Sequence, residues 1–360
     1  MSDGETSLPL PRERAVLVGH GEAEQTLLSA FQSGRLPHAW LIGGPRGIGK
    51  ATLAYRFARF LLNGGAEGGL FGGPTDLSVP AASPVVARVA AQAHPDLRVV
   101  ERTANERTGK LRTEIVVDDV RDLSSFLRLT PSDGGWRVAI VDAADEMNRN
   151  AANALLKVLE EPPDRAILLL VSHAPGRLLP TIRSRCRKLA LKPLPADQTD
   201  RLLAELQPGL APEERTALAV LSDGSPGRAL ELAAAGSLGL YRSIADLLGT
   251  LPALDLSRLH ALADRAARAG AEADFRTIGF LLGWWIESLV EEGARGKAAA
   301  TVMAGDAALR HRLAGSASLD RWVDVWEKNA QLFARADAVN LDRKQVVLGS
   351  FLALEAAART

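Results

Sequence analysis

A glycine-rich loop that ends in a lysine is the first stretch of this sequence with the residue types for chemistry. Leu41–Ala54 reads LIGGPRGIGKATLA and nearly matches the phosphate-binding pattern G-x-x-x-x-G-K-[ST], with Gly44, Gly49 and Lys50 at its fixed positions and Gly47 inside it. Glycines allow backbone N–H groups to approach a phosphate closely, and the start of a following helix adds the positive end of its dipole. The loop therefore predicts a phosphate-loop ancestry and a nucleotide site.

The two positions that hydrolysis at such a loop requires are both alanine. Ala51 stands where a hydroxyl residue should ligate Mg²⁺, and Thr52 comes one residue too late because a helix turns about 100° per residue. The stretch WRVAIVDAADEMN ends a predicted strand at Asp142, whose carboxylate can hold the metal shell, but Ala143 follows in place of the glutamate that would polarise the attacking water. We therefore expect ATP or ADP binding at Lys50, Thr52 and Asp142 to be weak or vestigial, and hydrolysis to be lost.

Four polar residues near the ends of predicted strands receive no firm chemical role. Asp145 and Glu146 follow Ala143 but lie further along the chain, which disfavours either one as the missing glutamate. Ser172 and His173 follow another apolar run, and a lone histidine is more often a satisfied structural residue than a catalyst. We leave Ser172 and His173 unassigned.

Three arginines, Arg183, Arg185 and Arg187, stand within five residues in TIRSRCRK. A run of charge is usually a solvated edge. The alternative is an arginine finger, a guanidinium offered to a nucleotide phosphate in a neighbouring subunit, where its planar fork matches the charge that develops on the phosphoryl group. Spacing alone leaves both interpretations open.

Composition bounds the class of protein. The 360 residues suggest two or three domains, and Lys plus Arg equals Asp plus Glu at 43 each, so the net charge indicates no nucleic-acid or membrane surface. The single cysteine, Cys186, excludes an intramolecular disulfide and a cysteine-based zinc site and is consistent with a reducing cytosol. The N-terminal stretch lacks the basic start and apolar run of a signal peptide, and no window reaches the roughly 18 apolar residues of a membrane span. We expect a cytoplasmic protein with no membrane partner and no zinc.

The elements that must position these residues alternate in the first half of the chain. Short apolar runs lie at 39–44, 96–100, 136–142 and 166–172, and helical patterns lie at 50–62, 117–129 and 148–161. Apolar runs between helices are typical of strands buried on both faces, which predicts an α/β fold with a parallel sheet sandwiched by helices. Residues 64–95, rich in glycine and proline, predict a surface insertion.

The second half of the chain is predicted to be all-α. After about residue 194 the strand-like runs stop, and short helical patterns with proline or glycine breaks continue to roughly residue 240. Longer helical patterns follow. The predicted domains are therefore an α/β domain over 1–193, a small helical domain over 194–242 and a second helical domain over 243–360.

The chain resembles the delta-prime family of clamp-loader subunits of bacterial DNA polymerase III, members of the AAA+ group. The motifs that carry this resemblance are, in order between about residues 36 and 230, LPHAWLIGGPRGIGKATLA, HPDL, VDDVR, WRVAIVDAADEMNRNAANALLKVLEEPP, LLLVSHAPGRLLPTIRSRC and SPGRAL, and NLDRKQVVLG near the end is also similar. No single motif is decisive, but the ordered set is specific and covers most of the chain.

The resemblance implies an AAA+ P-loop domain, a helical lid over 194–242 and a helical collar over 243–360 through which five subunits form an open ring. It implies that Arg185, the arginine of SRC, acts in trans on the ATP site of the adjacent motor subunit. The implied partners are the tau or gamma motor subunits and the delta subunit, with the sliding clamp and primed DNA reached through the complex. Many relatives carry a four-cysteine zinc module before HPDL, whereas this chain has no cysteine there.

Two further features gain meaning from the resemblance. Glu160 and Glu161 close a predicted helix at its negative end, where carboxylates are unfavourable; a cation from an adjacent subunit would explain them as interface residues, as would an exposed helix end that tolerates a small penalty. Ser225 is predicted to cap a helix that begins at Pro226, so Arg228 in its first turn requires a nearby anion. This fits a nucleotide-sensing arginine of the lid, and a plain solvent-facing arginine is the alternative.

We expect a non-hydrolysing subunit that completes the ring as a stator and lends Arg185 to its neighbour during loading of the sliding clamp on primed DNA. An active AAA+ remodelling or branch-migration ATPase is the alternative, and it requires Ala51 and Ala143 to be tolerated. A nucleotide-binding scaffold without a role on DNA is a third hypothesis.

Overall fold

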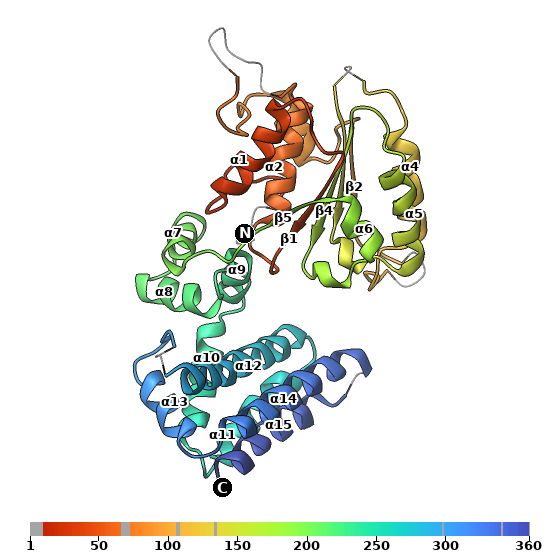
Figure 1. Ribbon diagram of the computed structural model, residues 1–360. Coiled ribbons are helices and arrows are strands. Elements are labelled where there is room, and N and C mark those ends of the chain that lie inside the picture. The colour runs from red at the N-terminus through yellow and green to blue at the C-terminus, as the bar shows by residue number, and fades with distance from the viewer. Residues whose placement is uncertain are drawn as a thin grey trace, which may run out of the picture. The chain divides into compact units, whose positions relative to one another are not determined.

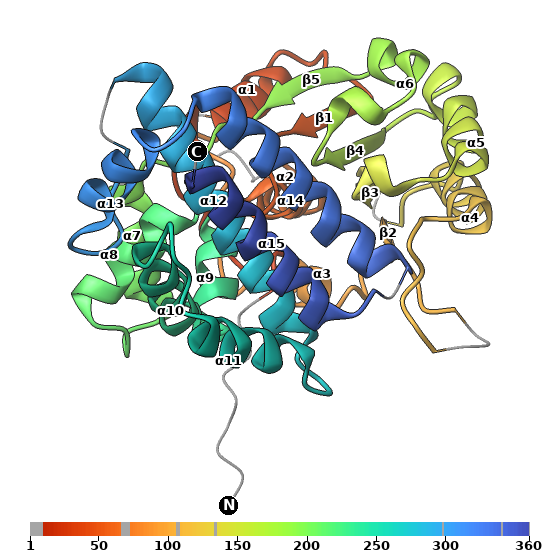
Figure 2. The same ribbon diagram turned by 90° about the horizontal axis from the view of Figure 1, so that it is seen from below.

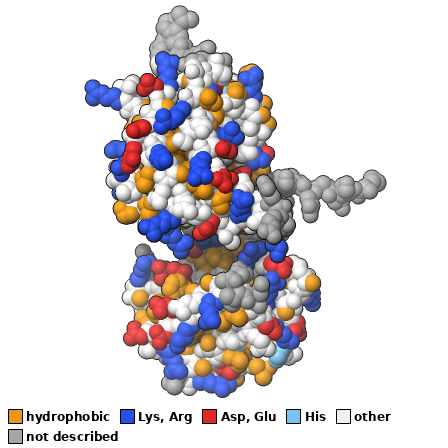
Figure 3. Space-filling model, turned by 90° about the vertical axis from the view of Figure 1, so that its right-hand side faces the viewer, with side chains coloured by type: hydrophobic (Ala, Val, Ile, Leu, Met, Phe, Trp, Pro, Cys, Tyr) orange, Lys and Arg blue, Asp and Glu red, His pale blue; other side chains and the backbone are white. Residues whose placement is uncertain are grey.

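The computed structural model describes residues 10–65, 73–105, 109–132, 135–296, 299–339 and 341–359, the side chains of 337–339 excepted. The chain divides into two compact units, Met1–Leu194 and Pro195–Thr360, which are described separately here. Figure 3 shows that basic and acidic side chains are interspersed on the face that it displays, in keeping with the equal numbers of the two charges. Within the described ranges, no helix combines the length and the apolar character needed to cross a membrane.

The first unit is built around a five-stranded, all-parallel sheet (Figure 1). Its strands are β1 (Ala39–Gly43), β2 (Leu97–Val100), β3 (Arg137–Asp142), β4 (Ala166–Ser172) and β5 (Arg187–Ala190), in the spatial order β2-β3-β4-β1-β5. Every residue of β1 and β4 is buried, because these central strands are covered on both faces. The predicted parallel sheet between helices is therefore confirmed.

Helices cover both faces of this sheet (Figure 1). Those in contact with one face are α1 (Gly21–Gln32), α2 (Lys50–Leu62) and α3 (Pro84–Ala90); those in contact with the other are α4 (Val117–Leu127), α5 (Arg149–Glu160) and α6 (Pro180–Arg185). Short 3-10 turns, η1 (Ala144–Glu146) and η2 (Pro175–Arg177), follow β3 and β4. Trp40 and Phe57 lie in the first core and Leu155 and Ile182 in the second, so the two faces bury separate apolar clusters.

The predicted surface insertion at 64–95 proves to be partly a structural element of the core. Its residues 66–72 lie outside the described ranges, but Leu77 is 1% exposed, Val89 is fully buried, and both belong to the core beside α2. Ser83 caps α3 by accepting a hydrogen bond from the Val85 amide at 3.3 Å. The sequence did not predict this helix, because seven residues are too few to show a helical periodicity.

The second unit is helical throughout its described part (Figure 2). Its helices are α7 (Ala196–Leu206), α8 (Pro212–Leu221), α9 (Pro226–Ala234), α10 (Ser237–Gly249), α11 (Leu256–Ala267), α12 (Glu272–Arg295), α13 (Asp306–Ala314), α14 (Leu319–Val339) and α15 (Arg343–Ala358). α14 and α15 lie side by side in both ribbon views (Figure 1, Figure 2). The boundary predicted at 242/243 falls within α10, so lid and collar share a continuous helix, and their division stays a prediction.

Two buried charged groups stabilise the second unit. Asp306 is 3% exposed and accepts hydrogen bonds from the Tyr241 hydroxyl at 2.8 Å and from two backbone amides. Arg310 is fully buried, and it binds the Glu292 carboxylate at 2.9 Å and the Ala299 carbonyl at 3.1 Å. Because buried polar groups are costly without partners, these bonds fix α10, α12 and α13 to one another.

A buried ion pair performs the same task in the first unit. The Arg137 guanidinium lies 3.2 Å from the Asp96 carboxylate, donates to the Thr130 carbonyl at 2.6 Å and stacks 4.8 Å over the Phe126 ring. Asp96 also accepts from the Ser132 amide at 3.1 Å. The pair therefore ties the segment after α4 to the paired strands β2 and β3.

We predict that Arg137→Ala lowers the free energy of unfolding of the first unit by about 3–5 kcal/mol, because it leaves the buried Asp96 carboxylate without its counter-charge. Urea titration of the full chain, with amide hydrogen exchange of β2 and β3 as the readout, measures this change. Arg121→Ala is the control, since Arg121 pairs with Asp118 at 3.2 Å on the surface, and its loss is expected to be under about 1 kcal/mol. Equal losses in the two variants would contradict the role given to the buried pair.

Candidate functional site

The glycine-rich loop joins β1 to α2 at the carboxyl end of the sheet. Gly44, Gly47 and Gly49 have φ angles of 148°, 77° and 102°, in the region that favours glycine. A Cβ atom on Gly44 would lie 2.5 Å from the Leu191 carbonyl oxygen and 2.7 Å from the Ile48 side chain. The loop conformation therefore depends on glycine, as the motif predicts.

A histidine that the sequence analysis missed holds this loop from outside. His20 is 6% exposed, and its Nε2 lies 2.7 Å from the Ile48 carbonyl oxygen, to which it donates. Burial lowers the pKa of His20. His20 directly precedes α1 and is 28 residues away from Ile48 in the sequence. No local sequence pattern therefore identifies this contact.

Lys50 faces its own loop. Lys50 is only 3% exposed, and its Nζ donates to the Gly44 carbonyl at 2.7 Å and to the Pro45 carbonyl. Burial lowers the pKa of Lys50 to about 8; Arg46 adds to this effect, whereas Asp142 and Asp145 oppose it. The lysine is therefore a buried cation that is held by backbone carbonyls.

Asp142 lies at the end of β3 within electrostatic reach of Lys50, so the structure brings together these two predicted residues. The pKa of Asp142 is raised to about 6, mainly by burial; Lys50 opposes this rise, and Glu101 and Glu146 contribute to it. At neutral pH the carboxylate and the ammonium are both charged and each offsets part of the cost of burying the other.

The alanines at the two hydrolytic positions leave no polar group there. Ala51 is partly exposed on the first turn of α2 and Ala143 is 3% exposed after β3, so methyl groups stand where a hydroxyl and a carboxylate would be required. Thr52 is 5% exposed inside α2. The predicted nucleotide-binding role of Thr52 stays a prediction, and burial gives it no support.

The two acidic residues beyond Ala143 are occupied by other contacts. Asp145 accepts hydrogen bonds from the His173 amide at 2.8 Å and the Ala174 amide at 3.1 Å. Burial alone would raise the pKa of Asp145, but the bond from the His173 amide and several smaller favourable interactions together outweigh burial, and the pKa is lowered. Glu146 pairs with Arg102 at 2.8 Å. Both carboxylates therefore serve the structure, which disfavours either one as a replacement for the missing glutamate.

Ser172 and His173 lie beside the loop because β4 is the neighbour of β1. Ser172 pairs in register with Gly43. His173 is half-buried, and its Nδ1 is without a hydrogen-bond partner among the described residues. Burial and the nearby Lys50 lower the pKa of His173. We assign His173 no chemical role.

Arg185 is the last residue of α6 and differs in setting from its two neighbours in the motif. Its side chain is 36% exposed, with one terminal nitrogen 2.9 Å from Glu160 Oε1 and the other donating to the Thr181 carbonyl at 3.1 Å. Arg183 is half-buried, and Arg187 is exposed on β5. Of the three arginines, Arg185 is the one placed by two contacts while still accessible.

The cations expected from an adjacent subunit for the end of α5 are present within this chain. Glu160 pairs with Arg185, and Glu161 lies 3.8 Å from Arg128 in a pair that is mostly exposed. An interface is therefore not needed to explain the two carboxylates at this helix end. Their place in a subunit interface stays a prediction.

Arg228 belongs to the second unit, whereas the other predicted nucleotide-binding residues belong to the first. Ser225 caps α9 as predicted and accepts from the Arg228 amide at 3.2 Å. The anion that the helix start requires is Asp223, 3.8 Å from the guanidinium, which also lies 4.9 Å over the Phe280 ring. Asp223 accepts a further bond from Trp284 at 3.0 Å. These contacts account for Arg228 without a nucleotide.

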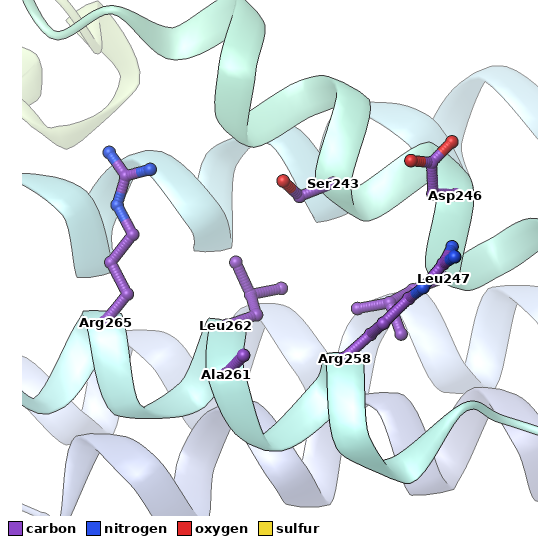
Figure 4. A pocket seen from close by; sticks show the side chains of 7 residues that line it. All are labelled: Ser243, Asp246, Leu247, Arg258, Ala261, Leu262 and Arg265. Atoms are coloured by element: carbon purple, nitrogen blue, oxygen red, sulfur yellow. The ribbon is translucent and has the colours of Figure 1, made fainter.

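A cleft of about 330 Å³ lies between α10 and α11 in the second unit. Figure 4 shows Ser243 and Asp246 on α10 opposite Arg258 and Arg265 on α11. Arg258 pairs with Asp255 at 3.2 Å, and Arg265 pairs with a neighbouring aspartate at 2.7 Å. Because both cations already have carboxylate partners, we assign this cleft no ligand.

We predict that the Nζ of Lys50 titrates near pH 8 instead of its usual 10.5. Because the folded-state pKa is the lower one, the unfolded chain binds the proton more tightly, so this group makes the free energy of unfolding rise between about pH 8 and 10.5. Carbon-13 NMR of labelled lysine, with Lys50→Arg to assign the signal, measures the titration. Asp142→Asn should lower the pKa of Lys50 further, since it removes an attracting carboxylate; a titration near 10.5 in the wild type would contradict this environment.

Comparisons with known proteins agree with these features. Residues 19–195 match the family model described as "DNA polymerase III, delta subunit". DNA polymerase III subunit delta' of Pseudomonas aeruginosa is 43% identical over 191 residues, which are 52% of this chain and 53% of that protein. DNA polymerase III subunit tau of Escherichia coli is 30% identical over 283 residues, which are 73% of this chain and 41% of that protein.

A solved structure of a DNA polymerase III gamma subunit-related protein from Thermotoga maritima aligns with a TM-score of 0.40 at 19% identity, over 92% of this chain and 100% of that one. The chain spans about half the length of the curated relatives it matches. The loop after β1 and the aspartate that ends β3 lie in a parallel sheet, as the sequence predicted. Over residues 19–195, the part of the chain that contains this loop and sheet, the chain is therefore similar to the DNA polymerase III delta-subunit family.

Proposed function

We propose that this chain is a clamp-loader subunit of a replicative DNA polymerase that does not hydrolyse ATP itself. It acts as a stator that completes the ring and supplies Arg185 in trans to the ATP site of an adjacent motor subunit. One observation carries this proposal. Both positions that hydrolysis requires, Ala51 and Ala143, have only a methyl side chain, whereas the Arg185 guanidinium is accessible at the end of a helix.

The chemistry of an arginine finger fits the setting of Arg185. A guanidinium is always charged, and its planar fork matches the oxygens of a phosphoryl group as charge develops there. Such a group must reach out of its own subunit, and the Arg185 side chain is 36% exposed. Its Glu160 partner is itself half exposed, so the pair leaves the guanidinium accessible from outside the subunit.

The proposed partners follow from the relatives' names and from the family resemblance. Similar proteins are named DNA polymerase III subunits delta', gamma/tau and tau. We propose tau or gamma motor subunits and a delta subunit as partners in the ring, with the sliding clamp and primer-template DNA reached through the complex. Residues 194–242 are proposed as the lid and 243–360 as the collar through which the subunits assemble.

Nucleotide binding is not required by this function. The Lys50 ammonium binds carbonyls of its own loop, so a phosphate must displace at least part of these contacts. The missing hydroxyl at Ala51 removes one ligand of Mg²⁺. Any ATP or ADP held by Gly44, Gly47, Gly49, Lys50 and Asp142 is therefore proposed to bind weakly.

An active remodelling or branch-migration ATPase remains the second candidate. It requires a group that polarises water after β3, and the two carboxylates that follow Ala143 in the chain are bound elsewhere: Asp145 to the His173 and Ala174 amides, and Glu146 to Arg102. No contact of the described residues therefore favours this candidate over the stator.

We predict that Arg185→Ala lowers ATP turnover at the motor site it serves by about 10³-fold or more, because an arginine finger stabilises charge in the transition state. Steady-state ATPase and clamp-loading rates of the reconstituted complex on primed DNA measure the loss. Arg185→Lys should not restore the rate, since a lysine lacks the planar fork. Arg187→Ala, an exposed arginine two residues along, is the matched control; an unchanged Arg185→Ala complex would overturn the finger assignment.

We also predict that the purified chain alone turns over ATP no faster than its Lys50→Ala variant, because the metal and water positions are both alanine. A phosphate-release assay on the two proteins, purified in parallel, makes the comparison. Turnover that is robust in the wild type and lost in Lys50→Ala would support the remodelling ATPase instead.

A further inference from the structure

We propose that Glu160 is a positioning residue for Arg185, holding the guanidinium in the orientation from which it reaches the neighbouring phosphate. This inference rests on the proposed function, because it assigns the residue that orients the same finger. Glu160 and Arg185 are the terminal residues of two different helices, α5 and α6, and meet at 2.9 Å.

Two contacts hold the Arg185 guanidinium and leave some of its N–H donors free to bind a phosphate. One terminal nitrogen bonds Glu160 Oε1 at 2.9 Å and the other bonds the Thr181 carbonyl at 3.1 Å. These bonds engage two of the five N–H donors of an arginine. Because the two contacts engage different terminal nitrogens, they restrict rotation of the guanidinium while other donors stay available for a phosphate.

Glu160 is itself mounted on a rigid element. Asn148 directly precedes α5, and its side chain caps the helix by accepting from the Ala151 amide at 2.9 Å. The helix buries Leu155 and Leu159 against the sheet, in the same core as Ile182 of α6. Because the backbone of Glu160 is fixed by this packing, its carboxylate offers a defined anchor.

The start of the segment that leads to Arg185 is fixed as well. Asp145 binds the His173 and Ala174 amides, directly after β4 and before α6. The segment from β4 to Arg185 is therefore tied to η1 where it leaves the sheet and to α5 where α6 ends.

Holding the finger before the nucleotide arrives has a physical benefit. A long arginine side chain loses rotamer freedom when it is held on a phosphate, and a side chain already oriented loses less at that step. The position of Glu160 also becomes intelligible, since a carboxylate at the negative end of a helix is unfavourable without a cation nearby. Its partner Arg185 is that cation.

The opposite role is a carboxylate that competes with the phosphate for the guanidinium. The two roles predict opposite signs: loss of an orienting carboxylate lowers the rate of the neighbouring motor, whereas loss of a competitor raises it. A rate measurement on the assembled complex therefore separates them.

The experiment uses the reconstituted complex with clamp and primed DNA and compares Glu160→Gln, Glu160→Ala, Arg185→Ala and the double variant Glu160→Ala/Arg185→Ala. Motor kcat and KM for ATP are measured for each. Asp118→Asn is the matched control for Glu160→Gln, since it neutralises the carboxylate of another exposed ion pair of the first unit. Circular dichroism and gel filtration establish that each variant folds and assembles.

We expect Glu160→Ala to lower kcat by about threefold to tenfold with KM nearly unchanged, and Glu160→Gln to lose less, because its amide oxygen still accepts a hydrogen bond. In the Arg185→Ala background, Glu160→Ala should have no further effect. A raised kcat, an equal loss with and without Arg185, or a loss matched by Asp118→Asn would overturn the positioning role. An Arg185→Ala complex with unchanged ATPase would overturn the proposed function together with this inference, so the two failures are distinguishable.

Discussion

Burial of the central strands on both faces is the constraint on which the first unit depends. β4 has no exposed residue and lies between β1 and β3, so neither of its faces has room for polar side chains. Polar side chains of β3 and β4 are therefore confined to the ends of these strands, and those at the carboxyl ends lie where the backbone leaves the sheet. Asp142 and Ser172 occupy these ends, and the loop with Lys50 begins beside them. Burial of the central strands therefore places the residues of the candidate site together at one edge of the sheet.

Electrostatics then determine what the gathered residues can do. Lys50 and Asp142 are buried near each other, and both are driven toward neutral forms by burial while each favours the charge of the other. Asp145, by contrast, has its charge stabilised by backbone amides. Carboxylates a few residues apart thus have different roles because their hydrogen-bond partners differ, which a count of acidic residues does not reveal.

The parts of this structure that follow local patterns were predictable from sequence. The strands at 39–43 and 166–172 and the helix at 50–62 lie where the apolar runs and the loop motif placed them, and Ser225 caps α9 as its residue type indicates. The contacts that were not predictable join distant residues. His20 reaches the loop carbonyl of Ile48, and Asp145 reaches two amides after β4, through side chains whose types are common and whose spacing carries no signal. The intrachain partners of Glu160 and Arg228 belong to the same class of contact.

The unbroken course of α10 has a mechanical consequence. Residue 242 lies inside this helix, while Asp223 bonds Trp284 and Arg228 stacks on Phe280 across the same region. A joint needs a few backbone residues that can absorb a change in dihedral angles, and a hydrogen-bonded helix turn does not supply them. Residue 242 is therefore not a hinge, and the contacts of Asp223 and Arg228 with α12 couple the short helices to the longer ones.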